Sequence, residues 1–269
     1  MFFVSDQTGV TAETMGHSLL TQFDGVEFRQ ITVPFISSVD KAAEAVRRIN
    51  LVAEIEGTRP IVCGTLIQPE VRDVVRSAQA FFLDFFEPFL APLEAELEVH
   101  SHHTAGRTHR MADTHEYVIR IDATNFALAN DDGSLVRDYD RADIILIGVS
   151  RSGKTPTCLY MAMQYGVFAA NFPLTEDDLE SRHLPRQLEP YKKKLFALTI
   201  QPERLQQIRN ERRPNSRYSS PQQVAFEVRA AESLFERHAI PTLDATGCSI
   251  EEIASRILDL TDVERRLRP

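Results

Sequence analysis

The segment GVSRSGKT, residues 148–155, combines residue types that suit the binding of a phosphate group. It follows the pattern G-x-x-x-x-G-K-[ST], in which the glycines let successive backbone N–H groups turn toward one anion. The side chain of Lys154 would reach the terminal phosphates, and the hydroxyl of Thr155 would hold Mg²⁺. The nucleotide-binding residues predicted from this pattern are Gly148, Val149, Ser150, Arg151, Ser152, Gly153, Lys154 and Thr155. The pattern indicates a nucleotide phosphate but does not identify the reaction.

A second candidate anion site lies in the segment SDQTG, residues 5–9. Ser5, Thr8 and Gly9 lie where a predicted strand gives way to a predicted helix, and their hydroxyl and backbone N–H groups could bind phosphate there. Asp6 could accept a proton from an attacking hydroxyl or bind Mg²⁺, which makes it a catalytic candidate. The spacing alone favours a simpler interpretation, in which Ser5 and Asp6 cap the helix and Gly9 only makes the turn.

Five arginines follow the phosphate-binding segment in the second half of the chain: Arg204, Arg209, Arg212, Arg213 and Arg217. In small kinases of this loop type, an arginine-rich lid closes over the transferring phosphoryl group and neutralises its charge. The alternative is a solvated helix face in which Glu203 and Glu211 pair with the arginines. We select Arg217, which lies in a predicted loop, as the catalytic candidate among them.

Five of the eight histidines gather in a polar segment, residues 100–117. They are His100, His102, His103, His109 and His115. Their spacing contains no helical H-x-x-x-H pair and no cysteine is near, so a mobile loop is favoured over a metal site. Within this segment, Arg107, His109 and Arg110 could meet an anion.

These candidates need a scaffold, and the hydrophobic pattern alternates between strand-like and helix-like segments, which predicts βαβ units and a parallel sheet. The predicted strands are 1–5, 27–35, 59–67, 143–148, 167–172, 195–200 and 240–246. The predicted helices are 11–23, 40–55, 68–82 with helical character continuing to 97, 117–130, 155–165, 201–213, 221–238 and one from 249 onward. We therefore predict an α/β fold with an N-terminal parallel-sheet half, residues 1–138, followed by a P-loop, kinase-like half, residues 139–269.

The composition limits the classes of partner. The chain has 269 residues and a formal net charge of −9, which argues against sequence-independent nucleic-acid binding. The most apolar segment, residues 80–93, is interrupted by acidic residues and prolines and is too short to span a membrane. Three scattered cysteines, Cys63, Cys158 and Cys248, fit a reducing compartment. With no signal peptide recognisable, we predict a cytoplasmic protein, and a homodimer is a possible assembly.

Several segments together resemble one known family. They are SDQTGVTAE, GVSRSGKTPTCLYMAMQYG, AANFPLTEDDL, KLFALTIQPERLQQIRNERRPNSRYSS and SIEEIASRILDL. In this order they are similar to the phosphoenolpyruvate synthase regulatory proteins, which are related to the pyruvate, phosphate dikinase regulatory proteins. The wording of LTIQPERL and NSRYSS favours the synthase branch over the dikinase branch. One departure is Gln7, where the family usually has a small residue, and this bulky side chain puts a tight backbone approach at position 7 in doubt.

The resemblance implies a bifunctional enzyme with ADP and inorganic phosphate as co-substrates. One activity would move the β-phosphate of ADP onto a threonine of phosphoenolpyruvate synthase and inactivate it. The other would remove that phosphate with inorganic phosphate, forming pyrophosphate and restoring activity. The family's nucleotide loop carries over to residues 148–155, with Mg²⁺ expected at Thr155.

The residues alone leave other functions open. Nothing in the loop distinguishes ADP from ATP, so the residues by themselves suggest an ATP-using small-molecule kinase. A nucleotide-binding switch that regulates by contact, without chemistry, is the third interpretation.

Overall fold

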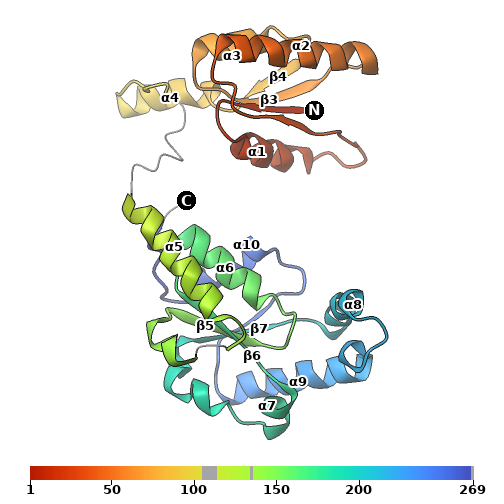
Figure 1. The fold of residues 1–269 in the computed structure, drawn as a ribbon, viewed down its shortest axis with the longest axis vertical. Coiled ribbons are helices and arrows are strands. Elements are labelled where there is room, and N and C mark those ends of the chain that lie inside the picture. Colours follow the sequence, from red (N-terminus) through yellow and green to blue (C-terminus); the bar gives the residue numbers. More distant parts are fainter. Residues whose placement is uncertain (105–113, 134–135, 268–269) are drawn as a thin grey trace. The chain divides into compact units, whose positions relative to one another are not determined.

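The computed structural model describes residues 1–104, 114–133 and 136–267, and the chain divides into two compact units, Met1–Arg110 and Met111–Pro269 (Figure 1). Each unit contains its own parallel sheet. The predicted α/β class with two successive halves is confirmed.

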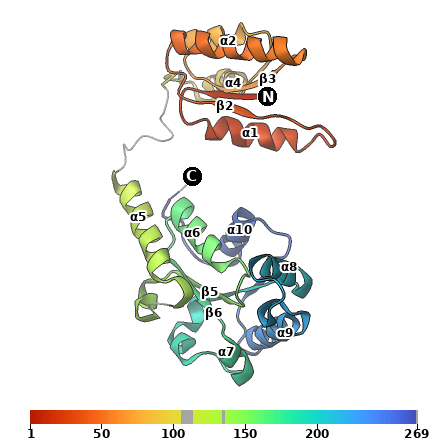
Figure 2. The same ribbon diagram turned by 45° about the vertical axis from the view of Figure 1, so that its right-hand side comes forward.

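The first unit is built around four parallel strands in the order β2-β1-β3-β4. The strands are β1 (Phe2–Ser5), β2 (Ile31–Val33), β3 (Ile61–Thr65) and β4 (Phe81–Asp84). The helices are α1 (Val10–Leu20), α2 (Val39–Glu56), α3 (Pro69–Arg76) and α4 (Glu87–Leu97). Helix α1 covers one face of the sheet, and α2 and α3 cover the other (Figure 2). Alternating side chains of β1 therefore enter two cores, with Phe2 and Val4 on the α2–α3 side and Phe3 on the α1 side.

Strand β4 interrupts the helix predicted over 68–82 with helical character to 97, of which α3 and α4 (Glu87–Leu97) are confirmed. Helix α3 ends at Arg76, and the chain then runs parallel to β3 from Phe81 to Asp84. Phe82 and Leu83 point to opposite faces of the sheet and pack against the two cores of this unit. Aromatic residues favour a pleated, half-buried surface, so pairing with β3 overrides the helical periodicity of the segment.

The second unit repeats the arrangement with strands in the order β6-β5-β7-β8. The strands are β5 (Ile144–Gly148), β6 (Ala169–Pro173), β7 (Leu195–Thr199) and β8 (Thr242–Asp244). The helices are α5 (Thr114–Ala129), α6 (Lys154–Tyr165), α7 (Glu176–Ser181), α8 (Pro202–Arg212), α9 (Pro221–Arg237) and α10 (Ile250–Leu260). Short 3₁₀ segments are η2 (Asp131–Gly133), η3 (Val136–Arg141), η4 (Arg186–Lys194) and η5 (Arg217–Ser219). Strand β5 is buried along its whole length, between α5, α6 and α10 on one face and α7 and α9 on the other.

The boundary between the units lies earlier than the predicted one at residue 138. Helix α5 belongs to the second unit, because Ala123 and Ala127 are buried in the same core as Cys158 of α6 and Ile257 of α10. The sequence contained a helical pattern here but no local signal for the sheet against which the helix packs.

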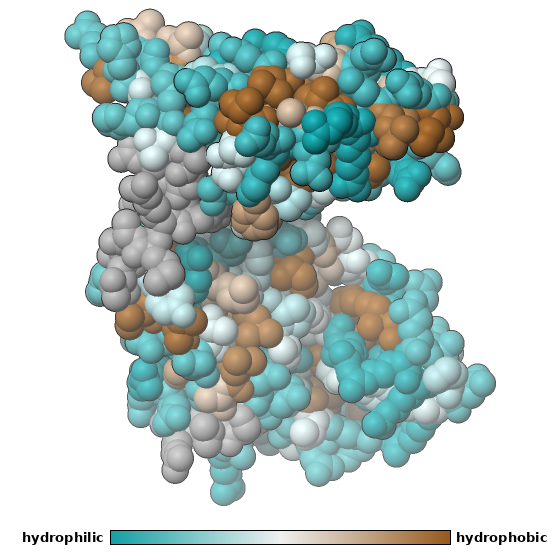
Figure 3. Space-filling view, turned by 45° about the horizontal axis from the view of Figure 1, so that its top comes forward, coloured by the Kyte–Doolittle hydropathy of each residue, from teal (hydrophilic) through white to brown (hydrophobic). Residues whose placement is uncertain are grey.

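The surface mixes polar and apolar groups, and apolar patches interrupt the hydrophilic surface of both units (Figure 3). Large apolar side chains that are exposed include Phe23, Phe35, Ile55, Phe89, Leu97 and Leu128. Among the described helices, none combines the length and hydrophobicity needed to cross a membrane.

Candidate functional site

The phosphate-binding segment lies between β5 and α6, in the strand–loop–helix context that the sequence predicted. Strand β5 ends at Gly148, and a Cβ added there would lie 2.4 Å from the carbonyl oxygen of Leu198 on β7. Helix α6 begins at Lys154 after Gly153, whose φ of 92° is in the left-handed region that favours glycine. Each glycine of the motif thus has its own structural reason, and the loop delivers the helix N-terminus to the edge of the sheet.

Lys154 is only 5% exposed, and its Nζ donates a hydrogen bond to the carbonyl oxygen of Val149 at 2.8 Å. Burial lowers the pKa of Lys154 to about 8, while the nearby carboxylates of Asp132 and Asp131 act in the opposite direction. In the same loop, the hydroxyl of Ser152 is buried without a hydrogen-bond partner. The loop therefore contains a cation and a polar group that protein contacts leave incompletely compensated, as an anion-binding site requires.

Thr155 meets two residues that the sequence analysis did not select. Its hydroxyl donates to Oδ1 of Asp131 at 2.8 Å, and the Nδ2 of Asn171 donates to the same carboxylate oxygen. The Oδ1 of Asn171 accepts the backbone N–H of Asp132 at 3.2 Å, which fixes η2 against β6. The available signal was an isolated asparagine in an apolar strand and an acidic pair directly after the predicted helix 117–130.

A hydroxyl and a carboxylate in contact form a hard-oxygen pair that suits Mg²⁺. Within the described part of the chain, no group of three His, Cys, Asp or Glu side chains could hold a metal by itself. Thr155 and Asp131 would therefore hold the ion together with phosphate oxygens and water, as Mg²⁺ sites on nucleotides commonly do.

A pocket of about 670 Å³ opens beside the loop. Its lining residues are Asp131, Asp132, Ser150, Arg151, Gly153, Lys154, Thr155, Pro156, Pro173, Ile208, Arg212, Arg213 and Tyr218. The volume is within the range of small-molecule sites, and the lining combines cations, carboxylates and the ring of Tyr218. This pocket has the size and chemistry for a nucleoside phosphate with a divalent ion.

The five predicted lid arginines separate into distinct environments. Arg212 and Arg213 line the pocket, and Arg209 is completely buried behind the loop. Arg204 donates to Gln207 on its own helix. The side chain of Arg217, our catalytic candidate, is 75% exposed, pairs with Glu176 and does not line this pocket. The geometry therefore favours Arg212 and Arg213 over Arg217 as the arginines nearest the loop.

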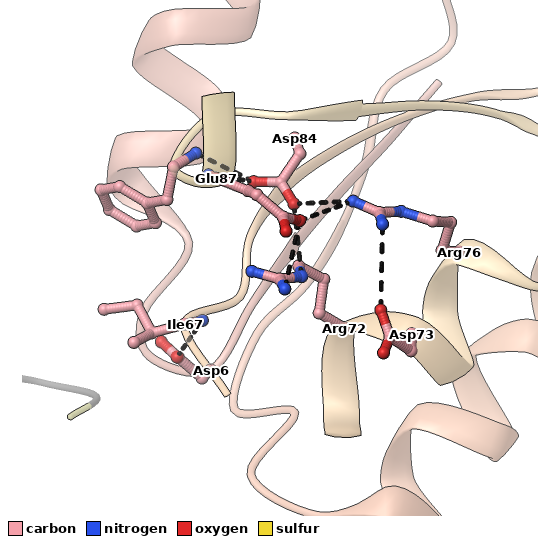
Figure 4. Close-up of polar contacts among 8 residues, drawn as sticks. Asp6, Ile67, Arg72, Asp73, Arg76, Asp84 and Glu87 are labelled. Atoms are coloured by element: carbon pink, nitrogen blue, oxygen red, sulfur yellow. Dashed lines mark hydrogen bonds and ion pairs between the residues drawn. The ribbon is translucent and has the colours of Figure 1, made fainter. Parts of the chain in front are cut away.

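The second candidate site, at the carboxyl end of β1 in the first unit, is not a simple helix cap. Ser5 and Asp6 make no capping hydrogen bond to α1; instead, Ser5 Oγ accepts the N–H of Gln7 at 3.1 Å. Oδ2 of Asp6 accepts the N–H of Ile67 at 3.1 Å, which joins the turns that follow β1 and β3 (Figure 4). Burial raises the pKa of Asp6. Gly9 has a φ of 87° and directly precedes α1, and Thr8 is exposed beside it.

Next to Asp6, Figure 4 shows an ion network that joins α3 to the start of α4. Arg72 and Asp84 are both buried, and their Nε and Oδ2 atoms lie 3.6 Å apart. Arg72 and Arg76 also contact Glu87 at 3.1 and 2.9 Å. Oδ1 of Asp84 accepts the N–H groups of Phe86 and Glu87, so the same carboxylate fixes the first turn of α4. All the cations of this network have anionic partners, which indicates a structural role.

The described part of the histidine-rich segment shows only local contacts. Arg107, His109 and Arg110 lie outside the described residues. His103 contacts the hydroxyl of Ser101 at 3.0 Å, and His100 lies 3.9 Å from Glu94.

Comparison with known proteins assigns this architecture to a family. A family model described as "Kinase/pyrophosphorylase" matches residues 1–258. The chain belongs to the kinase/pyrophosphorylase family. Membership supports a phosphotransferase, and the phosphate loop lies within the matched region.

Curated relatives cover nearly the whole kinase/pyrophosphorylase chain. Proteins from Stutzerimonas stutzeri (strain A1501) and Pseudomonas fluorescens (strain Pf0-1) are 54% and 53% identical over 267 residues. A protein from Hahella chejuensis is 52% identical over the same length. In each case the alignment covers 99% of this chain and 98% of the relative. All three are named "Putative phosphoenolpyruvate synthase regulatory protein".

Proposed function

We propose that the protein regulates phosphoenolpyruvate synthase by adding a phosphoryl group to one of its threonines and by removing it again. In the forward direction the threonine oxygen attacks the β-phosphorus of ADP, the bond to the α-phosphate breaks, and AMP leaves. The threonine hydroxyl proton goes to a base. In the reverse direction an oxygen of inorganic phosphate attacks the phosphothreonine phosphorus and the bond to the threonine oxygen breaks. The threonine oxygen takes up the proton that inorganic phosphate gives up, and pyrophosphate forms.

The observation that carries this proposal is the loop itself: a buried Lys154 beside the Thr155–Asp131 pair, on a pocket of nucleotide size. Backbone N–H groups of residues 148–155 would bind the β-phosphate, and the Lys154 ammonium would stabilise charge on the transferred group. Mg²⁺ held by Thr155 and Asp131 would neutralise phosphate charge and orient the phosphoryl group. Such a reaction requires positioning and electrostatics, without a covalent enzyme intermediate.

Asp6 in the first unit is our candidate for the base that accepts the threonine proton. Its position after β1 and its raised pKa make its carboxylate a stronger proton acceptor than an ordinary aspartate. Ser5, Thr8 and Gly9 would bind an anion at the same turn, and α1 has no side-chain cap competing for its first N–H groups. The names of the relatives favour the synthase over pyruvate, phosphate dikinase as the protein substrate. We further propose a cytoplasmic location, where the three free cysteines would stay reduced.

The deciding experiment incubates the purified full-length protein with phosphoenolpyruvate synthase and either ADP or ATP, and then measures the intact mass of the synthase. We expect one added phosphoryl group with ADP, on a threonine located by peptide mapping, and its removal with pyrophosphate formation when inorganic phosphate is added. An unmodified synthase with both nucleotides would contradict the proposal. Phosphorylation with ATP alone would change the donor, and phosphorylation of dikinase alone would change the protein substrate.

A further inference from the structure

Arg209 is the largest of the fully buried side chains, with an exposed fraction of 0%. It belongs to α8, beside Ile208, which lines the pocket, yet Arg209 itself does not reach the pocket. A buried guanidinium is costly unless its donors are paired. The partners of Arg209 therefore indicate what its position in the fold requires.

One partner is the backbone of the phosphate loop. Nε and Nη2 of Arg209 donate to the carbonyl oxygen of Ser150 at 3.3 and 3.1 Å. No described peptide bond is cis. In a trans peptide the C=O and the following N–H point in opposite directions, so holding the Ser150 carbonyl on the outer side turns the N–H of Arg151 the other way. Arg209 thus fixes the orientation of one peptide of the anion-binding loop.

The other partners lie in the segment that follows α8. Nη1 of Arg209 donates to the carbonyl oxygen of Tyr218 at 3.2 Å, and its guanidinium lies 4.3 Å from the centre of the Tyr218 ring. The Tyr218 hydroxyl contacts Oγ of Ser150 at 3.0 Å, and this contact joins Tyr218 to the phosphate loop. Glu227 of α9 balances the charge at 2.7 Å from Nη2.

The same segment holds Arg213. The Arg213 carbonyl oxygen accepts hydrogen bonds from the hydroxyls of Ser216 and Ser219 at 2.9 and 3.0 Å. The backbone N–H of Arg213 donates to the carbonyl oxygen of Arg209. A chain of contacts therefore runs from the loop, through Arg209 and the turn at 216–219, to the end of α8. Arg212 and Arg213 project from this end into the pocket lining. Among the described residues, neither guanidinium has a hydrogen-bond or ion-pair partner.

We propose that Arg209 is a positioning residue that joins the phosphate loop to Arg212 and Arg213, so that these two guanidinium groups face the phosphoryl group that the loop holds. This positioning role rests on the proposed function, because it requires a nucleotide in the loop. Two unpaired guanidinium forks suit the charge that spreads over phosphoryl oxygens during transfer.

The test compares Arg209→Lys in two backgrounds of the full-length protein, the unaltered chain and Arg212→Gln/Arg213→Gln. Lysine keeps the charge opposite Glu227 but cannot reach Ser150 and Tyr218 with one planar fork. We measure kcat for phosphate transfer from ADP to the synthase, ADP binding by calorimetry, and thermal unfolding. Arg209→Lys should lower kcat about tenfold in the unaltered chain. In the double-glutamine background, where the positioned groups are gone, it should lower kcat less than about twofold.

Ser219→Ala provides a milder second variant if Arg209→Lys does not fold, since it removes only one hydroxyl that holds Arg213. It should lower kcat about threefold in the unaltered chain and leave kcat unchanged in the double-glutamine background. Arg229→Lys, an exposed change on α9, is the matched control and should behave as the unaltered chain. Equal losses of kcat in both backgrounds would overturn the positioning role alone. An unaltered protein that neither binds ADP nor transfers phosphate would overturn the proposed function, and this inference with it.

Discussion

The two candidate sites share a backbone design and differ in charge. In both sheets the strand that leads into the site is flanked by the next strand on one side and the third on the other, in the orders β2-β1-β3-β4 and β6-β5-β7-β8. In both, the following helix begins after a glycine in the left-handed region, Gly9 or Gly153, without a side-chain cap. The charged residue buried in the turn is Asp6 in the first unit and Lys154 in the second.

This difference shows that similar turns can serve opposite chemistry. A free helix N-terminus favours an anion in either unit. In the second unit a lysine and two arginines strengthen that preference, whereas the buried carboxylate of Asp6 opposes it and favours a proton instead. In the proposed function, phosphate binding would therefore fall mainly to the second unit and proton acceptance to the first.

Lys154→Ala should have the largest effect, because in the proposed function it removes the cation that would stabilise the transferred phosphoryl group. Phosphorylation of the synthase and pyrophosphate formation should both fall about 1000-fold. Lys193→Ala changes an exposed lysine in η4 and should leave both rates unchanged. A regulator that acts by contact would still alter synthase activity with Ala at position 154, and that result would refute a catalytic role for the loop.

Asp6→Asn tests the other half of the comparison. The amide can still accept the N–H of Ile67, but it cannot accept a proton, so transfer from ADP should fall about 100-fold with ADP binding unchanged. Because burial raises the pKa of Asp6, its ionisation makes the fold less stable as the pH rises. The unfolding temperature of the variant at pH 7 should therefore equal or exceed that of the unaltered chain. Asp24→Asn is the matched control and should leave transfer and ADP binding unchanged. If Asp6→Asn weakened ADP binding, Asp6 would act in nucleotide binding and not as the proton acceptor.

Asp131→Asn should have a smaller effect that depends on Mg²⁺. It weakens the oxygen pair with Thr155, so the affinity for ADP should fall about tenfold when Mg²⁺ is present and change little when the metal is chelated. Calorimetric titration of ADP with and without Mg²⁺ measures both values. If Asp138→Asn, in η3, reduced affinity equally, the effect could not be assigned to the Thr155 contact.

The smallest effect that we expect is a pH dependence of binding. The pKa of Lys154 is lowered from its ordinary value of 10.5 to about 8, so the ammonium of the free protein loses its proton near pH 8. ADP affinity should fall a few-fold between pH 7 and pH 9. The unfolding free energy should instead rise as the pH increases from 8 to 10.5, because in this range the unfolded chain binds more protons at Lys154 than the folded chain does. Lys154→Met should abolish both trends, and an unchanged pH profile of ADP affinity in this variant would exclude Lys154 as their origin.

The sequence predicted features that local patterns specify. The loop at 148–155 carries its glycines and lysine in a fixed spacing, and apolar alternation indicated seven of the strands. The prediction of helix for Phe81–Asp84 was wrong, because this segment follows helical periodicity in the sequence and becomes a strand only through pairing with β3. The domain boundary was wrong because the core that receives α5 lies elsewhere in the chain.

The missed site residues depend on contacts between distant positions. Asp131 contacts Thr155 and Asn171, which lie 24 and 40 residues away in the sequence, and no helix or strand periodicity relates positions so far apart. The arginines of α8 look equivalent in sequence, but Glu227 and the Ser150 carbonyl select Arg209 for burial. Arg217 remained outside the pocket because Glu176, 41 residues away, pairs with it. Sequence patterns identify the candidate phosphate loop, whereas the fold decides which distant side chains lie beside it.

The close approach of other backbone atoms to Gly148 distinguishes it from Gly153, the other glycine of the loop motif. At 148 a methyl group would collide with the backbone oxygen of Leu198, and backbone atoms of a central strand cannot move aside. At 153 the added Cβ would have ordinary contact at 3.8 Å, and only the left-handed φ opposes substitution. In a randomised library selected for activity, position 148 should return glycine alone, while position 153 should also admit asparagine, the residue that tolerates this conformation best. Of the two glycines, position 148 thus combines a constraint of space with one of torsion, since its φ is 155°, whereas position 153 has the constraint of torsion alone.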